Sequence, residues 1–143
     1  MVPTLVAIDP GKHASGIAVF RDRVLEAVYY TKDTDVLSWL FAPDVRVIVE
    51  VPQVYSYERS KGDPNDLVDL AFAAGRMTRD FEHVDVVRPK QWKGQLPKDV
   101  HHQRVMAKLV QPECDVIHRA QVAQSKLHNV LDAVGLGLWK LGR

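Results

Sequence analysis

The stretch Leu5-Val6-Ala7-Ile8-Asp9-Pro10-Gly11 places an acidic residue directly behind an apolar run. The run begins at Val2 and predicts a β-strand that is buried on both faces. Burying an unpaired carboxylate costs several kcal/mol. An acidic residue in this place therefore reaches solvent at the strand end, belongs to an ion pair, or binds a metal ion.

The residues that follow predict a mixed sheet. Gly16 to Phe20 and Val24 to Tyr30 are strand-like and separated by three polar residues, so the first three strands form a meander. Asp35 to Phe41 predicts a short helix, and Val45 to Val51 predicts another buried strand. A strand, a helix and a second strand imply a crossover connection with parallel pairing.

The second half of the chain adds helices and one strand. The pattern predicts helices from Asn65 or Asp66 to Asp80, from Lys98 to Leu109 and from Leu127 to Leu141, with a strand from Val84 to Val87. The predicted order is βββαβαβαα, an α/β fold with a five-stranded mixed sheet and helices on both faces. In open α/β sheets, functional sites gather at the carboxyl ends of the central strands.

Length and composition limit the classes of protein that fit. We expect the 143 residues to form a single domain, residues 1–143. No apolar run approaches the ~20 residues that span a bilayer, and the N-terminus lacks the pattern of a signal peptide. We therefore expect a cytoplasmic protein without a membrane partner. The lone Cys114 excludes a disulfide framework and a thiolate zinc site.

Positive charge is concentrated in one segment. The chain has 19 Lys and Arg against 18 Asp and Glu, yet Arg88 to Lys108 holds six basic residues and only one acidic residue, Asp99. Trp92 lies within this segment. Basic side chains with an aromatic residue among them are typical of contact with nucleic-acid phosphates. An ordinary solvated helix face has the same composition.

Two further acidic residues lie in apolar surroundings. Glu50 lies near the end of the strand that begins at Val45, and Asp132 lies in the last predicted helix. The core face of that helix consists of Leu131, Val134, Leu138 and Leu141, and Asp132 lies at its edge. Gly135 and Gly137 each weaken a helix by roughly 1 kcal/mol, and close approach of the helix to the sheet is the simplest reason for them. Such an approach would bring Asp132 to the strand ends.

Three carboxylates from separate segments, meeting at one sheet edge, suit a hard divalent cation. Mg²⁺ prefers oxygen ligands and usually takes one or two carboxylates, which leaves room for water and phosphate oxygens. Two such ions, ~3.5–4 Å apart, activate a water and stabilise the leaving oxygen of a phosphodiester displacement. The residues therefore predict metal-dependent hydrolysis with two Mg²⁺ ions, for which Mn²⁺ is an expected substitute.

With these residues in view, the sequence resembles the RuvC-type Holliday-junction resolvases of the ribonuclease H-like superfamily, particularly their short bacteriophage-style members. Ala7 to Gly11 followed by Ser15 to Phe20 is similar to the family's first hairpin, with the first catalytic aspartate at Asp9. Ile48 to Glu50 is similar to the strand with the catalytic glutamate, and Leu131 to Ala133 to the C-terminal catalytic helix. The resemblance implies a ribonuclease H-like fold and an endonuclease that resolves four-way or branched DNA junctions during recombination and repair, in a bacterial or phage-infected cell.

The sequence departs from the family at one position. RuvC-type enzymes generally carry a fourth metal-site residue, an aspartate or histidine, three positions before the last aspartate, and here that residue is Asn129. His128 precedes it, and both share a helix face with Asp132. Asn129 offers a neutral oxygen, whereas His128 offers a nitrogen that suits Mn²⁺ or a general base or acid. Both stay open as the fourth residue, while His101 and His102 are expected on the exposed side of their helix.

The resemblance also implies a set of DNA contacts. The family has a loop after its glutamate with an aromatic residue at the junction centre, so Tyr55 or Tyr57 is expected to stack on an unpaired base. Lys98 falls where a family lysine lies close to the scissile phosphate, at a helix N-terminus that itself attracts phosphate. The remaining expected DNA-contact residues are Lys12, Arg59, Lys61, Lys90, Trp92, Lys93 and Arg104.

RuvC-type enzymes are two-fold dimers that place two sites on one junction, so the resemblance implies a homodimer. The helix that begins at Asp66 offers a small-residue face for such pairing, although this pattern is also typical of a helix that only packs in the core.

Three alternative functions were considered. The first is a ribonuclease H-like nuclease for structured RNA, and the second is a junction-binding module that no longer cuts. The third, a relative of actin and sugar kinases, needs two lobes, and the chain has the length for one.

Overall fold

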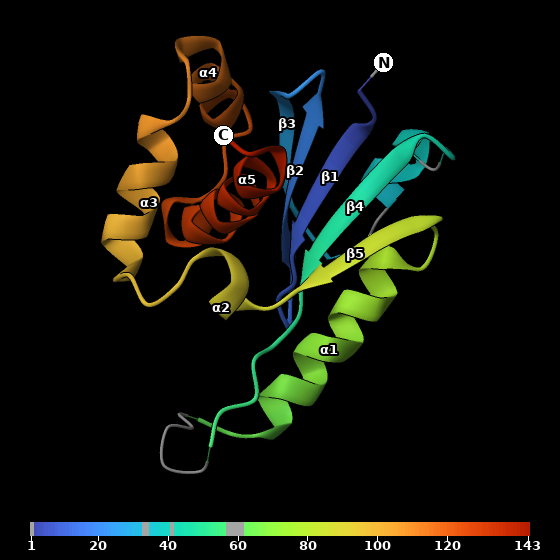
Figure 1. Ribbon diagram of the computed structural model, residues 1–143, viewed down its shortest axis with the longest axis vertical. Helices are drawn as coiled ribbons and strands as arrows, with labels where there is room; N and C mark the ends of the chain where they lie inside the picture. Colours follow the sequence, from blue (N-terminus) through green and yellow to red (C-terminus); the bar gives the residue numbers. More distant parts are fainter. Residues whose placement is uncertain (1, 33–34, 41, 57–61) are drawn as a thin grey trace.

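The computed structural model describes residues 2–32, 35–40, 42–56 and 62–143, and its centre is a five-stranded sheet (Figure 1). The strands lie in the order β3-β2-β1-β4-β5. β1 pairs with β2, and β2 with β3, in antiparallel fashion, whereas β1–β4 and β4–β5 are parallel pairs. The strand bounds are Thr4–Asp9 for β1, Ser15–Arg21 for β2, Val24–Thr31 for β3, Val45–Glu50 for β4 and His83–Val87 for β5. The predicted α/β fold with a mixed five-stranded sheet is confirmed.

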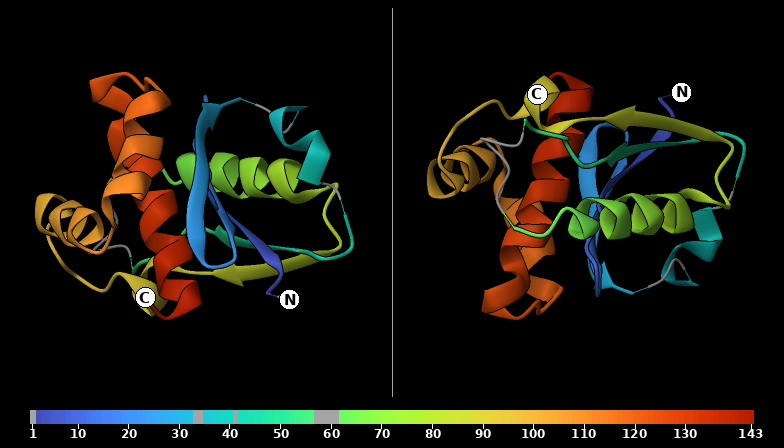
Figure 2. Two further views of the ribbon diagram at one scale, coloured as in Figure 1. Left: turned by 90° about the horizontal axis from the view of Figure 1, so that it is seen from above. Right: turned by 90° about the horizontal axis from the view of Figure 1, so that it is seen from below.

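Helices cover both faces of this sheet, as expected (Figure 2). The α-helices are α1 (Asn65–Thr78), α2 (Pro89–Trp92), α3 (Lys98–Ala107), α4 (Gln111–Arg119) and α5 (Leu127–Leu141), and the 3₁₀ helices are η1 (Asp35–Leu40) and η3 (Gln124–Lys126). One apolar core joins the sheet to α1 and η1, and a second joins its other face to α3, α4 and α5. No helix in the described part of the chain has the length and apolar character needed to cross a bilayer.

The register of the central parallel pair places two acidic residues side by side. Ile8 of β1 is paired with Val49 of β4, so Asp9 and Glu50 are the next residues at the carboxyl ends of neighbouring strands. Side chains alternate between the two faces of a strand. Ile8 and Val49 pack in the core with α1, so Asp9 and Glu50 point to the opposite face, where α5 lies. The sequence pattern therefore fixes both the edge and the face on which the two carboxylates meet.

Helix α5 is buried along most of its length. Every residue from Val130 to Leu138 is buried, because α5 lies between the sheet and α3 (Figure 1). The prediction that Asp132 lies at the edge of a one-sided core face is therefore wrong. Asp132 is 8% exposed inside a helix that is covered all round.

Close backbone contacts draw α5 onto the sheet. A Cβ atom added at Gly137 would collide with the ring of Phe20 in β2, and one at Gly16 in β2 would collide with the backbone of Asn129. Close approach to the sheet is thus the reason for Gly137, as expected. Gly135 has a different reason, because its neighbours are Val105 of α3 and two side chains of the α2–α3 region.

Three local predictions differ from the structure. The chain from Asp35 forms a 3₁₀ helix rather than an α-helix. The N–H of Asn65 at the start of α1 bonds to the Asp63 carboxylate, at 2.9 Å, so neither Asn65 nor Asp66 is the capping residue. α4 and the short α2 were not predicted as separate helices; both have a proline in their first turn, where the missing N–H costs nothing.

Candidate active site

Three carboxylates share one electrostatic environment on the α5 side of the sheet edge. Burial raises the pKa of Asp9 well above its ordinary value, and the negative charges of Asp132 and Glu50 raise it further. Burial also raises the pKa of Glu50, and Asp132 contributes in the same direction. Like charges have this effect only over short distances. Asp9 and Glu50 thus end neighbouring strands, and the charge of Asp132 acts on both of them.

Glu50 is held by two consecutive residues from α2 and its C-terminal end. The indole Nε1 of Trp92 donates a hydrogen bond of 2.6 Å to Glu50 Oε2, and Lys93 Nζ lies 3.4 Å from the same oxygen. Both contacts lower the pKa of Glu50, although burial outweighs them. Trp92 and Lys93, which were expected to contact DNA, thus also contact the candidate catalytic glutamate.

Asp132 is held from α3 rather than from its own helix. His102 Nε2 lies 3.0 Å from Asp132 Oδ1, within hydrogen-bond distance, and His101 Nε2 lies 3.8 Å from the same oxygen. The two imidazole side chains are only 12% and 15% exposed. The expectation that His101 and His102 lie on the exposed side of their helix is therefore wrong.

The inward position of these two histidines was hard to predict because α3 has few apolar residues on one face. Val105 is its one buried residue, and the partly buried residues are Val100, His101, His102 and Met106. Burial lowers the pKa of His101, and its ring packs edge-on against Trp92 with centroids 5.1 Å apart. The adjacent histidines shortly before Val105 were the only sequence feature that could have indicated their inward position.

Two lysines bring positive charge to the carboxylates. Burial lowers the pKa of Lys93, but the attraction of Glu50, Asp132 and Asp9 outweighs this effect, so the pKa is raised. Lys98, the first residue of α3, is close enough to lower the pKa of Asp9. Three acidic groups thus face two cations, and the free N–H groups at the start of α3 lie beside them.

The chemical type of the three side chains suits a hard divalent cation. Asp9, Glu50 and Asp132 offer only oxygen atoms, and their mutual repulsion, seen in the raised pKa of Asp9, is the situation that a bound cation relieves. Among the described residues, however, no three His, Cys, Asp or Glu side chains stand close enough to hold one ion as they are placed. Glu50 and Asp132 are instead directed to Trp92, Lys93 and His102.

The two candidates for a fourth metal-site residue lie at the start of α5. His128 is exposed and Asn129 is half-buried, and the structure describes no hydrogen bond between either side chain and Asp132. The backbone carbonyl of Asn129 packs against Gly16, which fixes the beginning of α5 over β2. The choice between His128 and Asn129 stays a prediction, and the histidine that contacts Asp132 is His102.

The other predicted DNA contacts are scattered around this edge. Lys12 is paired with Asp66 and Asp69 of α1, at 2.7 and 3.6 Å, and Tyr55 is 45% exposed in the segment after β4. Lys90 and Arg104 are exposed on α2 and α3. Tyr57, Arg59 and Lys61 lie outside the described residues.

Two solved structures share this fold along nearly the whole chain. The first, Thermus thermophilus RuvC in complex with a Holliday junction substrate, has a TM-score of 0.56 and 17% sequence identity, covering 98% of this chain and 96% of that chain. The second, a Thermus thermophilus RuvC structure, has a TM-score of 0.54 and 15% identity, covering 97% and 96%. Neither the family models nor the sequences of curated proteins match the chain. The chain therefore has the RuvC fold, which is ribonuclease H-like.

Proposed function

We propose that this protein is a structure-selective endodeoxyribonuclease that resolves four-way or branched DNA junctions by metal-dependent hydrolysis. The observation that carries this proposal is the register of β1 and β4, which sets Asp9 beside Glu50 on the face where α5 brings Asp132. The fold shared with RuvC, which was solved with a Holliday junction, supports the choice of substrate.

The three carboxylates are the residues that would hold two Mg²⁺ ions, or Mn²⁺ in their place. When bound, such ions supply an activated water and stabilise the leaving oxygen of the phosphodiester. Trp92 fixes the orientation of Glu50, and His102 fixes that of Asp132. Lys93 and Lys98 attract the phosphate to this edge, and the amides at the start of α3 add to the attraction.

The homodimer is also part of the proposal, because a four-way junction has two-fold pseudo-symmetry and a two-fold dimer matches it. Ala74 and Met77 of α1 pack in the core against the sheet and are not available for pairing. The opposite face of α1 exposes Val68 and Phe72, by 66% and 72%. We assign the dimer contact to this exposed face.

The dimer contact is tested by the substitution Phe72→Glu. We expect the wild-type chain to have twice the monomer mass of 16.2 kDa in light scattering, and the variant to have the monomer mass with an unchanged circular dichroism spectrum. A wild-type chain that is monomeric at micromolar concentration, free and on a junction, contradicts the homodimer.

The proposed activity is tested with a synthetic four-way junction, a matched linear duplex and a structured RNA, each with Mg²⁺ or Mn²⁺. We expect paired cuts in the junction alone, and none with the Asp9→Asn variant. Preferred cutting of the RNA would favour an RNA-processing nuclease. Junction binding without cuts in either metal would favour a binding module.

A further inference from the structure

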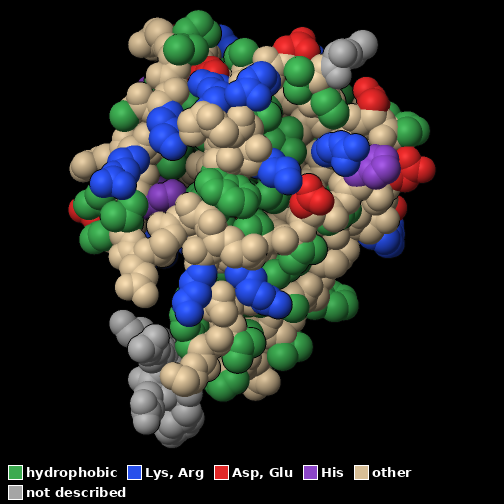
Figure 3. All heavy atoms as spheres, in the orientation of Figure 1, with side chains coloured by type: hydrophobic (Ala, Val, Ile, Leu, Met, Phe, Trp, Pro, Cys, Tyr) green, Lys and Arg blue, Asp and Glu red, His purple; other side chains and the backbone are tan. Residues whose placement is uncertain are grey.

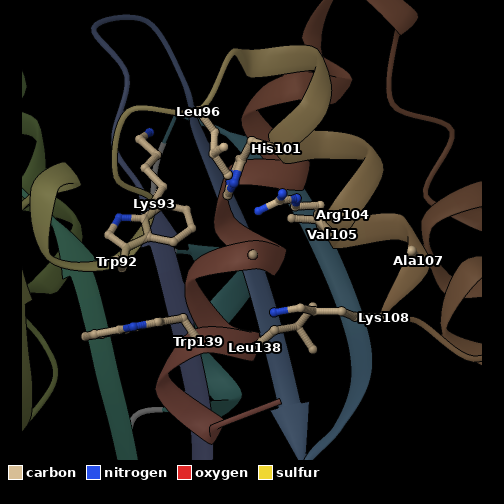
Figure 4. Close-up of a pocket in the computed structure, with 11 residues that line it drawn as sticks. Trp92, Lys93, Leu96, His101, Arg104, Val105, Ala107, Lys108, Leu138 and Trp139 are labelled. Carbon is tan, nitrogen blue, oxygen red and sulfur yellow. The ribbon is translucent and has the colours of Figure 1, made fainter.

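A cavity of about 420 Å³ lies beside the candidate active site, between α2, α3 and α5 (Figure 4). Its walls combine two kinds of side chain. The hydrophobic part includes Trp92, Leu96, Leu138 and Trp139, and the basic part consists of Lys93, Arg104 and Lys108. In Figure 4, Arg104 and Lys108 reach toward the hollow from the α3 side, while the two indole rings lie on the opposite side.

The charge of the lining is of one sign. Its Lys and Arg side chains are cationic, and none of the described residues that line the cavity is acidic. Lys108 Nζ donates to the backbone carbonyl of Arg143, at 3.0 Å, whereas the structure describes no ion pair for Arg104. On the face seen in Figure 3, basic side chains surround a hydrophobic area over α5. An anionic ligand with an apolar planar part is complementary to such a site.

The floor of the cavity depends on Gly135. A Cβ atom added there would lie 2.8 Å from Val105 Cγ2 and 3.2 Å from Trp92 Cζ3. The bare backbone at this turn of α5 lets α3 and Trp92 approach and leaves the space above it open. Trp139, one turn later, is 41% exposed, so its ring is free to receive a flat ligand.

The cavity and the candidate active site share three residues, one of which is His101, whose Nε2 lies 3.8 Å from Asp132 Oδ1. Trp92 turns its ring to the cavity and its Nε1 to Glu50, and Lys93 lines the cavity while its Nζ lies 3.4 Å from Glu50. A DNA strand that places a phosphate at the carboxylates therefore has the next nucleotide within reach of the cavity. Leu96 and Arg104 flank that route.

We propose that this cavity binds one unstacked nucleotide of the DNA strand that crosses the active site, with its base on Trp139 and a phosphate on Arg104. Base–aromatic stacking and a basic groove are the usual means of holding single-stranded DNA. The inference rests on the proposed function for the presence of the strand. It adds a site that selects a position where a base is easily unpaired, as it is at a branch point.

The test is photochemical cross-linking in EDTA, where no cutting occurs. Junctions that carry 5-iodouracil at successive positions next to the branch are irradiated with the full chain and digested with trypsin. Trypsin separates the three tryptophans, because Trp39, Trp92 and Trp139 lie in the peptides 33–46, 91–93 and 127–140. We expect one branch-adjacent position to cross-link to peptide 127–140 or 91–93.

The affinity of matched variants gives a second measurement. We expect Trp139→Ala to weaken junction binding about 5- to 100-fold, the size of one lost base stack, and Trp139→Phe to restore most of it. Trp39→Ala is the control, because Trp39 is similarly exposed, at 52%, but belongs to η1, which packs on the other face of the sheet. Arg104→Ala is compared in the same way with Arg79→Ala, an exposed arginine paired with Asp80.

Two results overturn the proposal: cross-links that avoid both peptides at every position tested, or equal affinities for the Trp139→Ala and Trp39→Ala variants. These outcomes are separate from the proposed function, which is read from cutting with Mg²⁺. A chain that cuts junctions without these cross-links keeps the activity and loses the nucleotide site. If the chain cross-links through Trp139 but never cuts, the proposed activity is wrong and the nucleotide site is supported.

Discussion

His102 Nε2 lies 3.0 Å from Asp132 Oδ1, so a side chain from α3 holds the carboxylate of a different helix, α5. A partner of this kind orients a metal-binding carboxylate, and its loss typically costs about 10- to 100-fold in metal affinity. We expect His102→Ala to weaken Mn²⁺ binding to the DNA-free protein by this factor, measured by calorimetry. His118→Ala, an exposed histidine on α4, is the control and should bind Mn²⁺ as the wild type does. Equal affinity in both variants would show that His102 does not position Asp132.

Glu50→Gln removes a charge while keeping the shape of the side chain. We expect it to lower the rate of junction cutting about 100-fold or more, the size of a lost electrostatic contact in the transition state. Junction binding should be equal or tighter, because less negative charge faces the phosphate. Asp132→Asn should behave in the same way. Single-turnover cutting rates and gel-shift affinities of each variant test this expectation. If a variant cuts at the wild-type rate, the substituted residue does not belong to the active site.

Asp9→Asn should stabilise the metal-free protein at neutral pH. The raised pKa of Asp9 means that the folded state holds a proton over a pH range in which the unfolded state has released it. Stability from this group is therefore present at low pH and is lost as the pH rises from the ordinary carboxyl value through the raised one. We expect the variant to melt a few degrees higher at pH 7.5 in EDTA, about 3 °C for each kcal/mol. The difference should vanish near pH 4.

The same pair of proteins reports on metal binding. A cation that binds only the folded state raises the melting temperature, so Mg²⁺ should stabilise the wild type more than Asp9→Asn. A melting difference that is the same at pH 4 and pH 7.5, with or without Mg²⁺, contradicts an electrostatically strained Asp9.

The glycines of the α5 contact should be intolerant of a methyl group. We expect Gly137→Ala to lower the free energy of unfolding by about 1–3 kcal/mol, because the added Cβ collides with Phe20 in a filled core. Gly16→Ala should cost at least as much, because its neighbour is backbone. Gly75→Ala in α1 is the matched control, with nothing within 4 Å of the added Cβ. It should gain about 0.5–1 kcal/mol from helix propensity, and urea denaturation measures all three.

The parts of the fold that could be predicted are those in which the local pattern agrees with the packing. β1 and β4 are mainly apolar strands that end in an acidic residue, so their parallel pairing and the adjacency of Asp9 and Glu50 could be predicted from sequence alone. The helices that pack on the sheet were harder to predict. α5 is covered on all sides, so its apolar residues do not mark one face.

The surroundings of the carboxylates could not be predicted because they depend on tertiary contacts between separate elements. Nothing in the residues around His102 shows that α3 folds back over α5, and α2 is too short to have a periodic pattern. Trp92 and Lys93 were recognised only as candidate DNA contacts, because they are distant from Glu50 in the sequence. Trp92 and Glu50, which share a hydrogen bond, are 42 positions apart. The candidate catalytic residues were visible in the sequence, whereas the residues that contact them were not.

The indole of Trp92 belongs to two environments at once, with its N–H on Glu50 and its ring on the wall of the neighbouring cavity. A ligand in the cavity that tilts this ring changes the geometry of its hydrogen bond to Glu50. An ion that moves the Glu50 carboxylate changes the orientation of the ring in the same way. By thermodynamic reciprocity, filling the cavity and loading the carboxylates must then alter each other's affinity by the same factor. One aromatic side chain thereby couples the cavity to the candidate active site.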